Sequence, residues 1–347
     1  MPAAASSVHT VSPQRRDEPP AGTDRLAAEY VLPLRWSEDS GLDELTAYLR
    51  RLCRWADVTV VDGSPAGIFA RHHEAWRGLV RHLPPDQDLR YANGKVNGVT
   101  TGLRRARHEL VVIADDDVRY DLDGLRAVLD ALRAAELARP QNYFSPMVWH
   151  ARWDTARSLL NRSLGGDYPG TLGVRRSAFL RLGGYDGDVL FENLELIRTV
   201  RAGDGREARL DDVYVRRLPP DTGRFLGQRV RQAYDDLAQP VRLAAFLSVA
   251  PVCAVALATG RRWVPVALAA AAVAVAEHGR RRYGGTSVFP ASASLLAPVW
   301  VAERAVCGWL AVGLRAATGG VRYAGRRIGT AAHTTRQIRT RIASNGA

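Results

Sequence analysis

The sequence predicts an α/β domain with a largely parallel sheet, followed by a C-terminal part made of apolar helices. From residue 29 to about residue 150, short apolar runs alternate with amphipathic stretches of helical spacing. Strands that alternate with helices of 10 to 15 residues are typical of a parallel sheet covered by helices. The C-terminal part is predicted from long uncharged segments that begin at about residue 241.

The expected elements follow the hydrophobic periodicity along the chain. Residues 1–24 are rich in Ala, Ser, Pro and charge and show no periodicity, so we expect a disordered leader. We expect strands at Tyr30–Leu34, Val58–Val61, Asp88–Ala92, Glu109–Ala114 and Tyr143–Trp149, and helices at Leu42–Trp55, His72–His82, Lys95–Arg107 and Leu122–Leu137. Ligands of such sheets bind at the carboxyl ends of the strands, where Asp62 and Asp115 both lie.

The charge of the chain is concentrated at its C-terminal end. The formal net charge is +12, from 48 basic and 36 acidic residues. From Val241 onward there are 14 Arg and only two acids, Glu277 and Glu303, so the first 240 residues are neutral. A basic chain suggests a nucleic-acid or anionic-membrane partner. After Trp309 the basic tail has Tyr323 as its only aromatic residue and contains no known motif, so nucleic-acid binding is the weakest hypothesis.

Three apolar segments predict membrane helices. Leu243–Gly260 has 18 uncharged residues and Trp263–Ala276 has 14. The first would be about 27 Å long as a helix, which is about one hydrocarbon core. Arginine clusters bracket both segments, and this favours a membrane over the alternative of a buried core. The third segment, Ala293–Leu314, contains Glu303 and Arg304. It is either a span with a buried ion pair or an interfacial helix, so two or three spans remain possible.

Three adjacent carboxylates, Asp115, Asp116 and Asp117, follow the expected strand Glu109–Ala114. They repel one another, and a fold tolerates them best where a cation or solvent screens them. In extended chain the first and third point the same way and offer two oxygen ligands to Mg²⁺ or Mn²⁺. A metal there would bridge nucleotide phosphates and neutralise a departing diphosphate. The alternative is an acidic turn that caps the next helix.

Lys95 is the only lysine among the 48 basic residues. It stands in the segment Gly94-Lys95-Val96-Asn97 and opens the helix that leads to the acidic strand end. A cation at a helix start meets an anion that also interacts with the helix N-terminus. The alternative is a solvated surface lysine. His72 and His73 are expected on a solvated helix face, because no nearby Cys or acidic cluster completes a metal site.

The chain resembles family 2 glycosyltransferases of the GT-A fold over about residues 28 to 330. The resemblance begins with Pro33 in the first strand and rests on five segments that occur in the family's order. These are Val61-Asp62-Gly63-Ser64, Gly94-Lys95-Val96-Asn97, Asp115-Asp116-Asp117, the GG(F/Y)…ED-like stretch from Leu182 to Leu196, and the QxxRW-like Gln228-Arg229-Val230-Arg231-Gln232. The pattern is most similar to membrane-bound members, such as ceramide glucosyltransferase-like and hopanoid or polyprenyl glycosyltransferases.

The resemblance implies roles for residues on the donor side. Asp62 would contact the base or ribose of the nucleotide. Asp115 and Asp117 would bind the metal and the diphosphate of the nucleotide sugar. Lys95 is a candidate for the phosphate side of the same site.

The resemblance also implies that Gln228 and Arg231 hold the diphosphate and close the site from the membrane side. The planar donors of an Arg match phosphate oxygens. The implied cofactor is Mg²⁺ or Mn²⁺. The implied partners are a nucleotide-diphospho-sugar donor, a lipid or lipid-linked acceptor and the membrane, with no nucleic acid.

Two departures from the family pattern concern catalysis. The family's "ED" pair reads Glu192-Asn193, and Asn cannot accept the proton that the aspartate takes in many members. Glu192 or Glu195, three residues later on the same helix face, would then be the base, and we favour Glu192. The aromatic residue of QxxRW is replaced by Gln232. The implied reaction is an inverting transfer, and the alternative is a catalytically impaired, sugar-nucleotide-binding relative or scaffold.

The expected organisation has five parts. After the leader come a GT-A catalytic domain at residues 25–220, an amphipathic Q-x-x-R segment at 221–240, membrane helices at 241–315 and a basic tail at 316–347. A cytosolic nucleotide sugar requires the catalytic domain on the cytoplasmic face of the cell (inner) membrane. The basic tail also prefers the cytoplasmic side.

Overall fold

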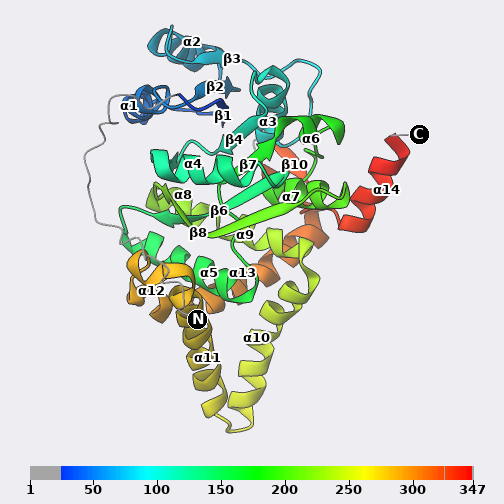
Figure 1. Cartoon of the computed structure of the whole chain (residues 1–347). Helices are drawn as coiled ribbons and strands as arrows, with labels where there is room; N and C mark the ends of the chain where they lie inside the picture. The colour runs from blue at the N-terminus through cyan, green and yellow to red at the C-terminus, as the bar shows by residue number, and fades with distance from the viewer. Residues whose placement is uncertain (1–24, 324, 346–347) are drawn as a thin grey trace, which may run out of the picture.

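An eight-stranded mixed sheet forms the centre of the catalytic part in the computed structural model, which describes residues 25–323 and 325–345 (Figure 1). The expected leader lies outside the described residues. The strands are β1 (Ala28–Leu34), β2 (Asp57–Asp62), β3 (Arg81–Leu83), β4 (Leu110–Ala114), β5 (Val118–Arg119), β6 (Leu137–Phe144), β7 (Thr171–Arg175) and β8 (Glu207–Arg217). Their order in the sheet is β3-β2-β1-β4-β7-β6-β8-β5.

The sheet is mostly parallel. Strands β3, β2, β1 and β4 run parallel to one another, and β6 runs parallel to β8. Strand β7 is antiparallel to both β4 and β6, and β5 is antiparallel to β8. The predicted α/β class and the mostly parallel sheet are therefore confirmed. The parallel half brings the ends of β1, β2 and β4 to one edge.

Nine helices belong to the described catalytic part between residues 25 and 234. They are α1 (Leu42–Leu52), α2 (Ala66–Ala75), α3 (Gly94–Arg105), α4 (Leu122–Ala131), α5 (Trp149–Leu164), α6 (Arg176–Arg181), α7 (Glu192–Ala202), α8 (Thr222–Gly227) and α9 (Arg229–Tyr234). The strands expected at Tyr30–Leu34, Val58–Val61 and Glu109–Ala114 and the helices expected at Leu42–Trp55 and Lys95–Arg107 are confirmed with small shifts. The helix predicted at His72–His82 is displaced, because α2 begins at Ala66 and ends at Ala75, and residues 81–82 belong to β3. Helix α4 ends six residues earlier than predicted.

Two predicted strands are wrong. Residues 88–92 lie in a loop, and the third parallel strand is the short β3. The strand predicted at Tyr143–Trp149 is displaced, because β6 ends at Phe144 and Trp149 begins α5. Strand β6 carries buried polar side chains, among them Arg139, which pairs with Glu207 at 2.8 Å. Because of these polar residues, the hydrophobic pattern alone does not predict a strand at residues 137–144.

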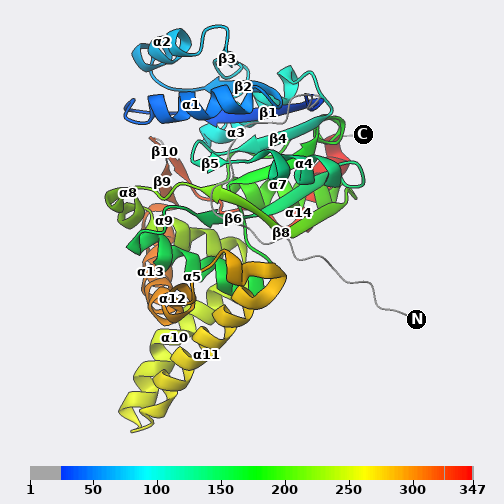
Figure 2. The same cartoon turned by 60° about the vertical axis from the view of Figure 1, so that its left-hand side comes forward.

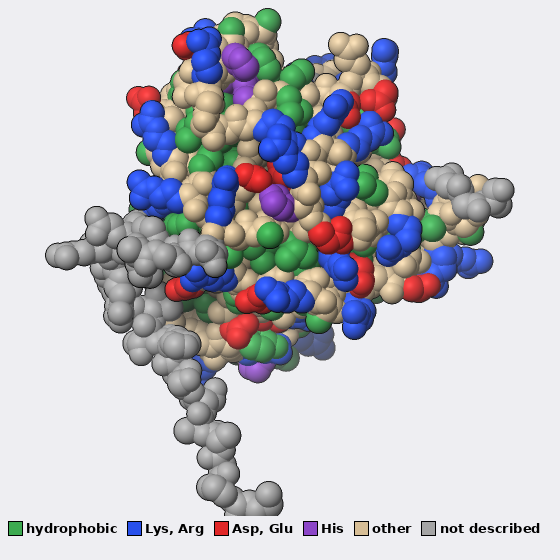
Figure 3. Space-filling model, turned by 45° about the horizontal axis from the view of Figure 1, so that its top comes forward, with side chains coloured by type: hydrophobic (Ala, Val, Ile, Leu, Met, Phe, Trp, Pro, Cys, Tyr) green, Lys and Arg blue, Asp and Glu red, His purple; other side chains and the backbone are tan. Residues whose placement is uncertain are grey.

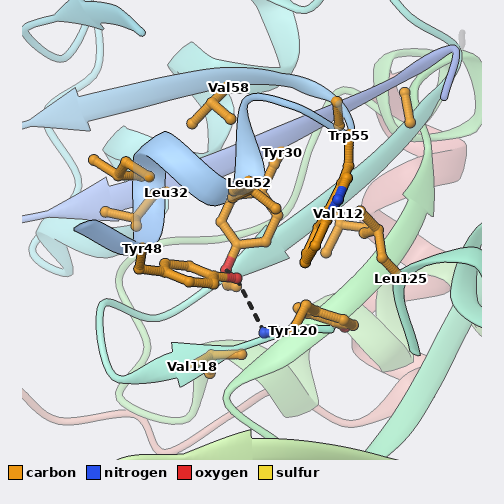
Figure 4. Close-up of a cluster of buried hydrophobic side chains, with 14 of the residues drawn as sticks. Tyr30, Leu32, Tyr48, Leu52, Trp55, Val58, Val112, Val118, Tyr120 and Leu125 are labelled. Carbon is orange, nitrogen blue, oxygen red and sulfur yellow. Dashed lines mark hydrogen bonds between the residues drawn. The ribbon is translucent and has the colours of Figure 1, made fainter. Parts of the chain in front are cut away.

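A cluster of aromatic side chains supports the loop that follows β4 (Figure 4). The Tyr48 hydroxyl accepts a 3.0 Å hydrogen bond from the backbone N–H of Tyr120. The rings of Tyr30 and Tyr120 meet edge to face, with centroids 6.1 Å apart. Aromatic pairs prefer this geometry. Since Tyr120 follows β5 directly, this core holds the acidic triplet at the edge of the sheet.

Helix α3 lies unusually close to β1 because it presents glycines to the strand. A Cβ on Gly98 would lie 2.8 Å from Cβ of Pro33, and one on Gly102 would collide with Val31. Interiors do not tolerate such overlaps. The close packing places the N-terminus of α3, with Lys95, beside the carboxyl ends of β1 and β4.

The apolar C-terminal part includes a two-helix hairpin that projects from the body (Figures 1 and 2). Helices α10 (Pro240–Ala258) and α11 (Trp263–Arg281) form the hairpin, with Arg261 and Arg262 at its tip. A short turn, η2 (Arg282–Ser287), and helices α12 (Ala291–Leu295) and α13 (Ala297–Thr318) follow.

Two helices, α10 and α13, are long and apolar enough to cross a membrane, by length and composition alone. Only 6% of the most apolar window of α10 is buried, against 39% for α13. Helix α11 is not among them, and its last turns contain Glu277, Arg280 and Arg281. Large apolar side chains such as Val255 and Trp263 are exposed on the hairpin.

One alternative for the segment of α13 expected a span with a buried ion pair. In the structure, Glu303 and Arg304 do not pair with each other. Arg304 contacts Asp236 at 3.4 Å, and Glu303 contacts Arg229 at 2.6 Å. On a helix, consecutive side chains diverge by about 100°. Each therefore meets a partner in the segment that follows the catalytic domain.

The residues expected as a basic tail fold back onto the catalytic domain. They form β9 (Val321–Tyr323), β10 (Arg326–Ile328) and α14 (Thr335–Asn345), and α14 packs against α7 (Figure 1). Arg341 pairs with Asp186, and Arg339 lies 3.6 Å from Asp204. On the face shown in Figure 3, basic side chains are spread with acidic ones among them.

Candidate active site

A cleft of about 740 Å³ opens at the carboxyl ends of β1, β2 and β4. This is the edge at which parallel sheets bind ligands. The cleft is lined by the acidic triplet, by the N-termini of α3 and α7, by the end of β8 and by the segment from α8 to α10. Of the residues proposed from the sequence, it contains Lys95, Asp115, Asp117, Glu192, Gln228 and Arg231.

Lys95 joins two of the predicted site residues. Its Nζ lies 2.6 Å from Oδ1 of Asp115 and 2.5 Å from Oε1 of Glu192. Asn93 caps helix α3 by accepting a 3.1 Å hydrogen bond from the backbone N–H of Lys95. Burial disfavours the charged lysine, but the two carboxylates outweigh it and raise the pKa of Lys95. Lys95 is therefore a charged bridge inside the cleft and not a solvated surface lysine.

Arg217, at the end of β8, holds the acidic triplet. Its guanidinium lies 2.9 Å from Oδ2 of Asp117 and 3.4 Å from Oδ2 of Asp115. Burial raises the pKa of Asp115, but the charges of Lys95 and Arg217 lower it below its ordinary value. Burial, opposed by Arg217 and aided by the neighbouring aspartates, raises the pKa of Asp117 to about 6. The sequence analysis missed Arg217, because nothing in the local pattern places β8 beside β5.

The acidic triplet suits a divalent cation. Within the described residues, Oδ1 of Asp117 is buried and has no hydrogen-bond partner. A buried carboxylate oxygen without a partner is costly unless a cation or water meets it. Carboxylate oxygens are the ligands that Mg²⁺ and Mn²⁺ prefer. Asp116 is directed differently and accepts a hydrogen bond from Nε1 of Trp36.

Asp62 does not line the cleft, contrary to the expectation that it contacts the nucleotide. Its side chain is buried and directed to the opposite side of the strand end, where Nδ1 of His72 lies 2.6 Å and Nε2 of His82 lies 3.1 Å from Oδ2. Its Oδ1 accepts a 2.8 Å hydrogen bond from the backbone N–H of Ser64. Burial opposes ionisation, but these hydrogen bonds lower the pKa of Asp62 to about 2. Asp62 therefore shapes the turn after β2.

His72 is buried, which corrects its expected place on a solvated helix face. Its Nε2 lies 3.2 Å from Oδ1 of Asp39. Asp62, His72 and His82 offer ligand atoms within 4.8 Å of one another, a spacing that a metal ion can also use. The long-range contacts that bury His72 are not visible in its local sequence. His73 is exposed as expected.

Glu195 is buried and turned away from the cleft. Its Oε2 accepts a 2.7 Å hydrogen bond from the backbone N–H of His333, whose Nδ1 lies 2.9 Å from Oε1. Glu195 thus fastens the C-terminal segment to α7, and this placement does not fit a catalytic base. Asn193 lines the cleft and donates a 3.0 Å hydrogen bond to the carbonyl of Pro169.

Arg231 and Gln228 line the cleft, as do Gln239 and Arg242 at the start of α10. The guanidinium of Arg231 lies 5.2 Å from the centre of the Tyr323 ring, within the range of a cation–π contact. Tyr323 comes from the C-terminal segment and was not predicted. Gln232, in the place of the family's aromatic residue, accepts a 3.0 Å hydrogen bond from Arg229.

Asp235 is a further cleft residue that the sequence analysis missed. It begins a 3₁₀ turn, η1 (Asp235–Ala238), directly before α10. Removal from bulk water raises the pKa of Asp235 to about 7, although the charges of Arg231 and Arg304 oppose this. Its position four residues after Arg231 was visible in the sequence, but its exposure to the cleft was not.

A family model for glycosyl transferase family 21 matches residues 68–139. This segment covers less than half of the chain and contains Lys95 and the acidic triplet. No curated protein matches the chain.

Two solved structures to which the chain is similar are themselves transferases or synthases. One is the mannosyltransferase PcManGT from Pyrobaculum calidifontis in complex with GDP-Man and Mn²⁺, at 20% identity and TM-score 0.49, covering 83% of this chain and 88% of that one. The other is glucosyl-3-phosphoglycerate synthase from Mycobacterium tuberculosis in complex with phosphoglyceric acid, at 18% identity and TM-score 0.44, covering 61% of this chain and 78% of that one. The family match over residues 68–139 supports a glycosyltransferase.

Proposed function

We propose that the protein is a membrane-bound, inverting glycosyltransferase of the GT-A type that transfers a sugar from a nucleotide-diphospho-sugar to a lipid or lipid-linked acceptor. The observation that carries this proposal is the cleft at the strand ends, where Lys95, the acidic triplet and Arg217 meet. Acidic and basic side chains that lie next to each other in this way suit a ligand that carries both a diphosphate and neutral hydroxyl groups. The family match over residues 68–139, which include Lys95 and the acidic triplet, supports it.

The donor side of the proposed site is formed by the acidic triplet and the basic residues around it. Arg217 and Arg231 would contact diphosphate oxygens, because guanidinium groups donate in a planar fork. Asp115 and Asp117 would hold Mg²⁺ or Mn²⁺, which when bound neutralises charge on the departing diphosphate. Lys95 and the N-terminus of α3 add positive potential on the same side.

The acceptor side of the proposed site adjoins the apolar helices. Gln239, Arg242 and Arg304, from the start of α10 and from α13, line the cleft. An amphiphilic acceptor that sits in the bilayer beside α10 would reach the cleft with its polar head. We therefore propose the cell (inner) membrane as the location, with the catalytic domain on the cytoplasmic face and α10 in contact with lipid. An insertion assay would determine the number of membrane spans.

A second candidate function is a sugar-nucleotide-binding relative without turnover. Asn193, in place of the family's aspartate, favours it, since its amide donates to Pro169. Such a protein would bind a nucleotide sugar in the cleft and leave it intact.

The test is a panel of labelled nucleotide sugars offered to membranes that contain the protein, with thin-layer separation of lipid products. Transfer of label to a lipid, lost in Asp117→Asn and kept in Asp123→Asn, is the expected result. Asp123 is an exposed acid on α4 and serves as the matched control. Donor binding without product would favour the second candidate. Failure of every donor to bind would refute both.

A further inference from the structure

The transfer reaction needs a carboxylate that accepts the proton of the acceptor hydroxyl, and this inference rests on the proposed function. In the centre of the cleft the carboxylates already have partners. Glu192 is bound to Lys95, and Asp115 is bound to both Lys95 and Arg217. Both carboxylates therefore already have a cationic partner in the cleft.

The remaining acids of the triplet are also committed. Asp116 accepts from Trp36, and one oxygen of Asp117 is bound by Arg217. The other oxygen of Asp117 lies at the proposed cation site on the donor side. Neither acid is free for the acceptor.

The acids around the rim of the cleft serve structural contacts. Glu44 pairs with Arg119, and Asp154 contacts Arg229 at 3.1 Å. Asp221 caps helix α8 by accepting a hydrogen bond from a backbone N–H at 2.8 Å. Asp236 is buried between two arginines of α10 and α13, at 3.0 and 3.4 Å.

Asp235 differs from all of these. Within residues 25–323 and 325–345, its side chain is recorded in no hydrogen bond or ion pair, and it lines the cleft. It stands in the turn between Arg231 of α9 and the first residue of α10, on the side where an acceptor would arrive from the bilayer. The donor-side acids Asp115 and Asp117 lie in a different segment, the loop that follows β4.

We infer that Asp235 is the catalytic carboxylate that accepts the proton of the acceptor hydroxyl. Oδ of Asp235 takes the hydroxyl proton as the hydroxyl oxygen forms its bond to the anomeric carbon. The bond between that carbon and the diphosphate oxygen breaks at the same time, and the nucleoside diphosphate leaves with the electron pair. Protonated Asp235 then returns its proton to water. In this arrangement Glu192 is a positioning residue that holds Lys95.

The charges that face Asp235 suit this role. Arg231 from α9 and Arg304 from α13 favour the ionised form, whereas Glu192 from α7 and the adjacent Asp236 disfavour it. With burial, the balance gives a pKa of about 7. A base works best when its pKa lies near the operating pH, because it is then ionised and still accepts a proton readily.

The experiment compares Asp235→Asn, Asp235→Glu, Glu192→Gln and the control Asp123→Asn in the full chain. It measures the turnover number across pH 5 to 9 and the affinity for the nucleotide sugar selected by the donor panel. We expect Asp235→Asn to lower the turnover number by about 10²–10⁴-fold, as for loss of a general base, with donor affinity unchanged within about twofold. The rise of turnover through pH 7 should disappear in Asp235→Asn and persist, at a reduced rate, in Asp235→Glu.

Three outcomes would overturn the inference. If the wild type catalyses transfer and Asp235→Asn keeps full activity, another group is the base, and the proposed function still stands. Loss of donor binding in both Asp235 variants would assign the residue to the donor site or to folding. A wild-type protein that neither binds nor consumes any nucleotide sugar would refute the proposed function, and this inference with it.

Discussion

Nζ of Lys95 lies 2.5 Å from Oε1 of Glu192, although the two residues are 97 positions apart in the chain. The contact joins the N-terminus of α3 to the N-terminus of α7 across the cleft. Because Lys95 also contacts Asp115, one lysine bridges two carboxylates that would otherwise repel each other. The ammonium group therefore reduces the repulsion between these two acids of the cleft.

Replacing Lys95 by Met should destabilise the protein and weaken donor binding. Asp115 and Glu192 would face each other without a cation, and a buried acceptor left unpaired costs about 1–3 kcal/mol, or more when it is charged. Thermal unfolding in detergent and binding of a nucleoside diphosphate with Mn²⁺ would measure both effects. Lys95→Arg, which keeps the charge, should recover part of the stability. Unchanged unfolding of Lys95→Met would contradict the bridge.

The Asp62 cluster should make stability depend on pH at the acid end. The pKa of Asp62 is about 2 in the folded protein against an ordinary value of 3.8, so the unfolded chain binds this proton more tightly. The stabilisation from ionised Asp62 is therefore present above pH 4 and is lost as the pH falls toward 2. A shift of this size corresponds to about 2 kcal/mol.

The variant Asp62→Asn provides the measurement for this cluster. Its free energy of unfolding should be lower than that of the wild type at pH 7, and the difference should shrink between pH 4 and pH 2. Donor affinity at pH 7 should change less than in Asp117→Asn, because Asp62 is outside the cleft. A difference that does not vary with pH would show that ionised Asp62 is not stabilising.

The contact between Glu195 and His333 should be structural and not catalytic. Glu195→Gln and His333→Ala should each lower the unfolding free energy by about 1–3 kcal/mol. His333→Ala leaves Oε1 of buried Glu195 without its partner, and Glu195→Gln replaces one of the two acceptor oxygens by a donor. The pH dependence of turnover should stay that of the wild type in both variants. An altered pH profile in Glu195→Gln, with unchanged stability, would restore Glu195 as a candidate base.

The exposed apolar face of α10 should determine membrane attachment. Val255 and Leu257 are 61% and 56% exposed. Charged residues within the apolar part of a membrane helix disfavour insertion, so Val255→Arg with Leu257→Arg should reduce co-flotation with phospholipid vesicles. The variant Asp123→Arg, on α4, is the control for added positive charge. Wild-type protein that remains soluble without detergent and does not float would refute the attachment.

The sequence by itself determined the elements whose local pattern is strong. Strands β1, β2 and β4 alternate with amphipathic helices, and the uncharged run of α10 is unmistakable, because burial in a parallel sheet and contact with lipid both require continuous apolar residues. The placement of Lys95, Asp115 and Glu192 in one cleft also agrees with the sequence, since each follows a strand or begins a helix at the same edge.

Only the tertiary structure decided which side chains face the cleft. Asp62 and Glu195 look like site residues in the sequence, yet His72 and His333, both distant in the chain, bind them outside the cleft. Arg217 and Asp235 enter the cleft through the packing of β8 and the turn before α10. Local patterns describe how a residue is placed within its own element, whereas its partner is set by long-range packing that no local pattern contains.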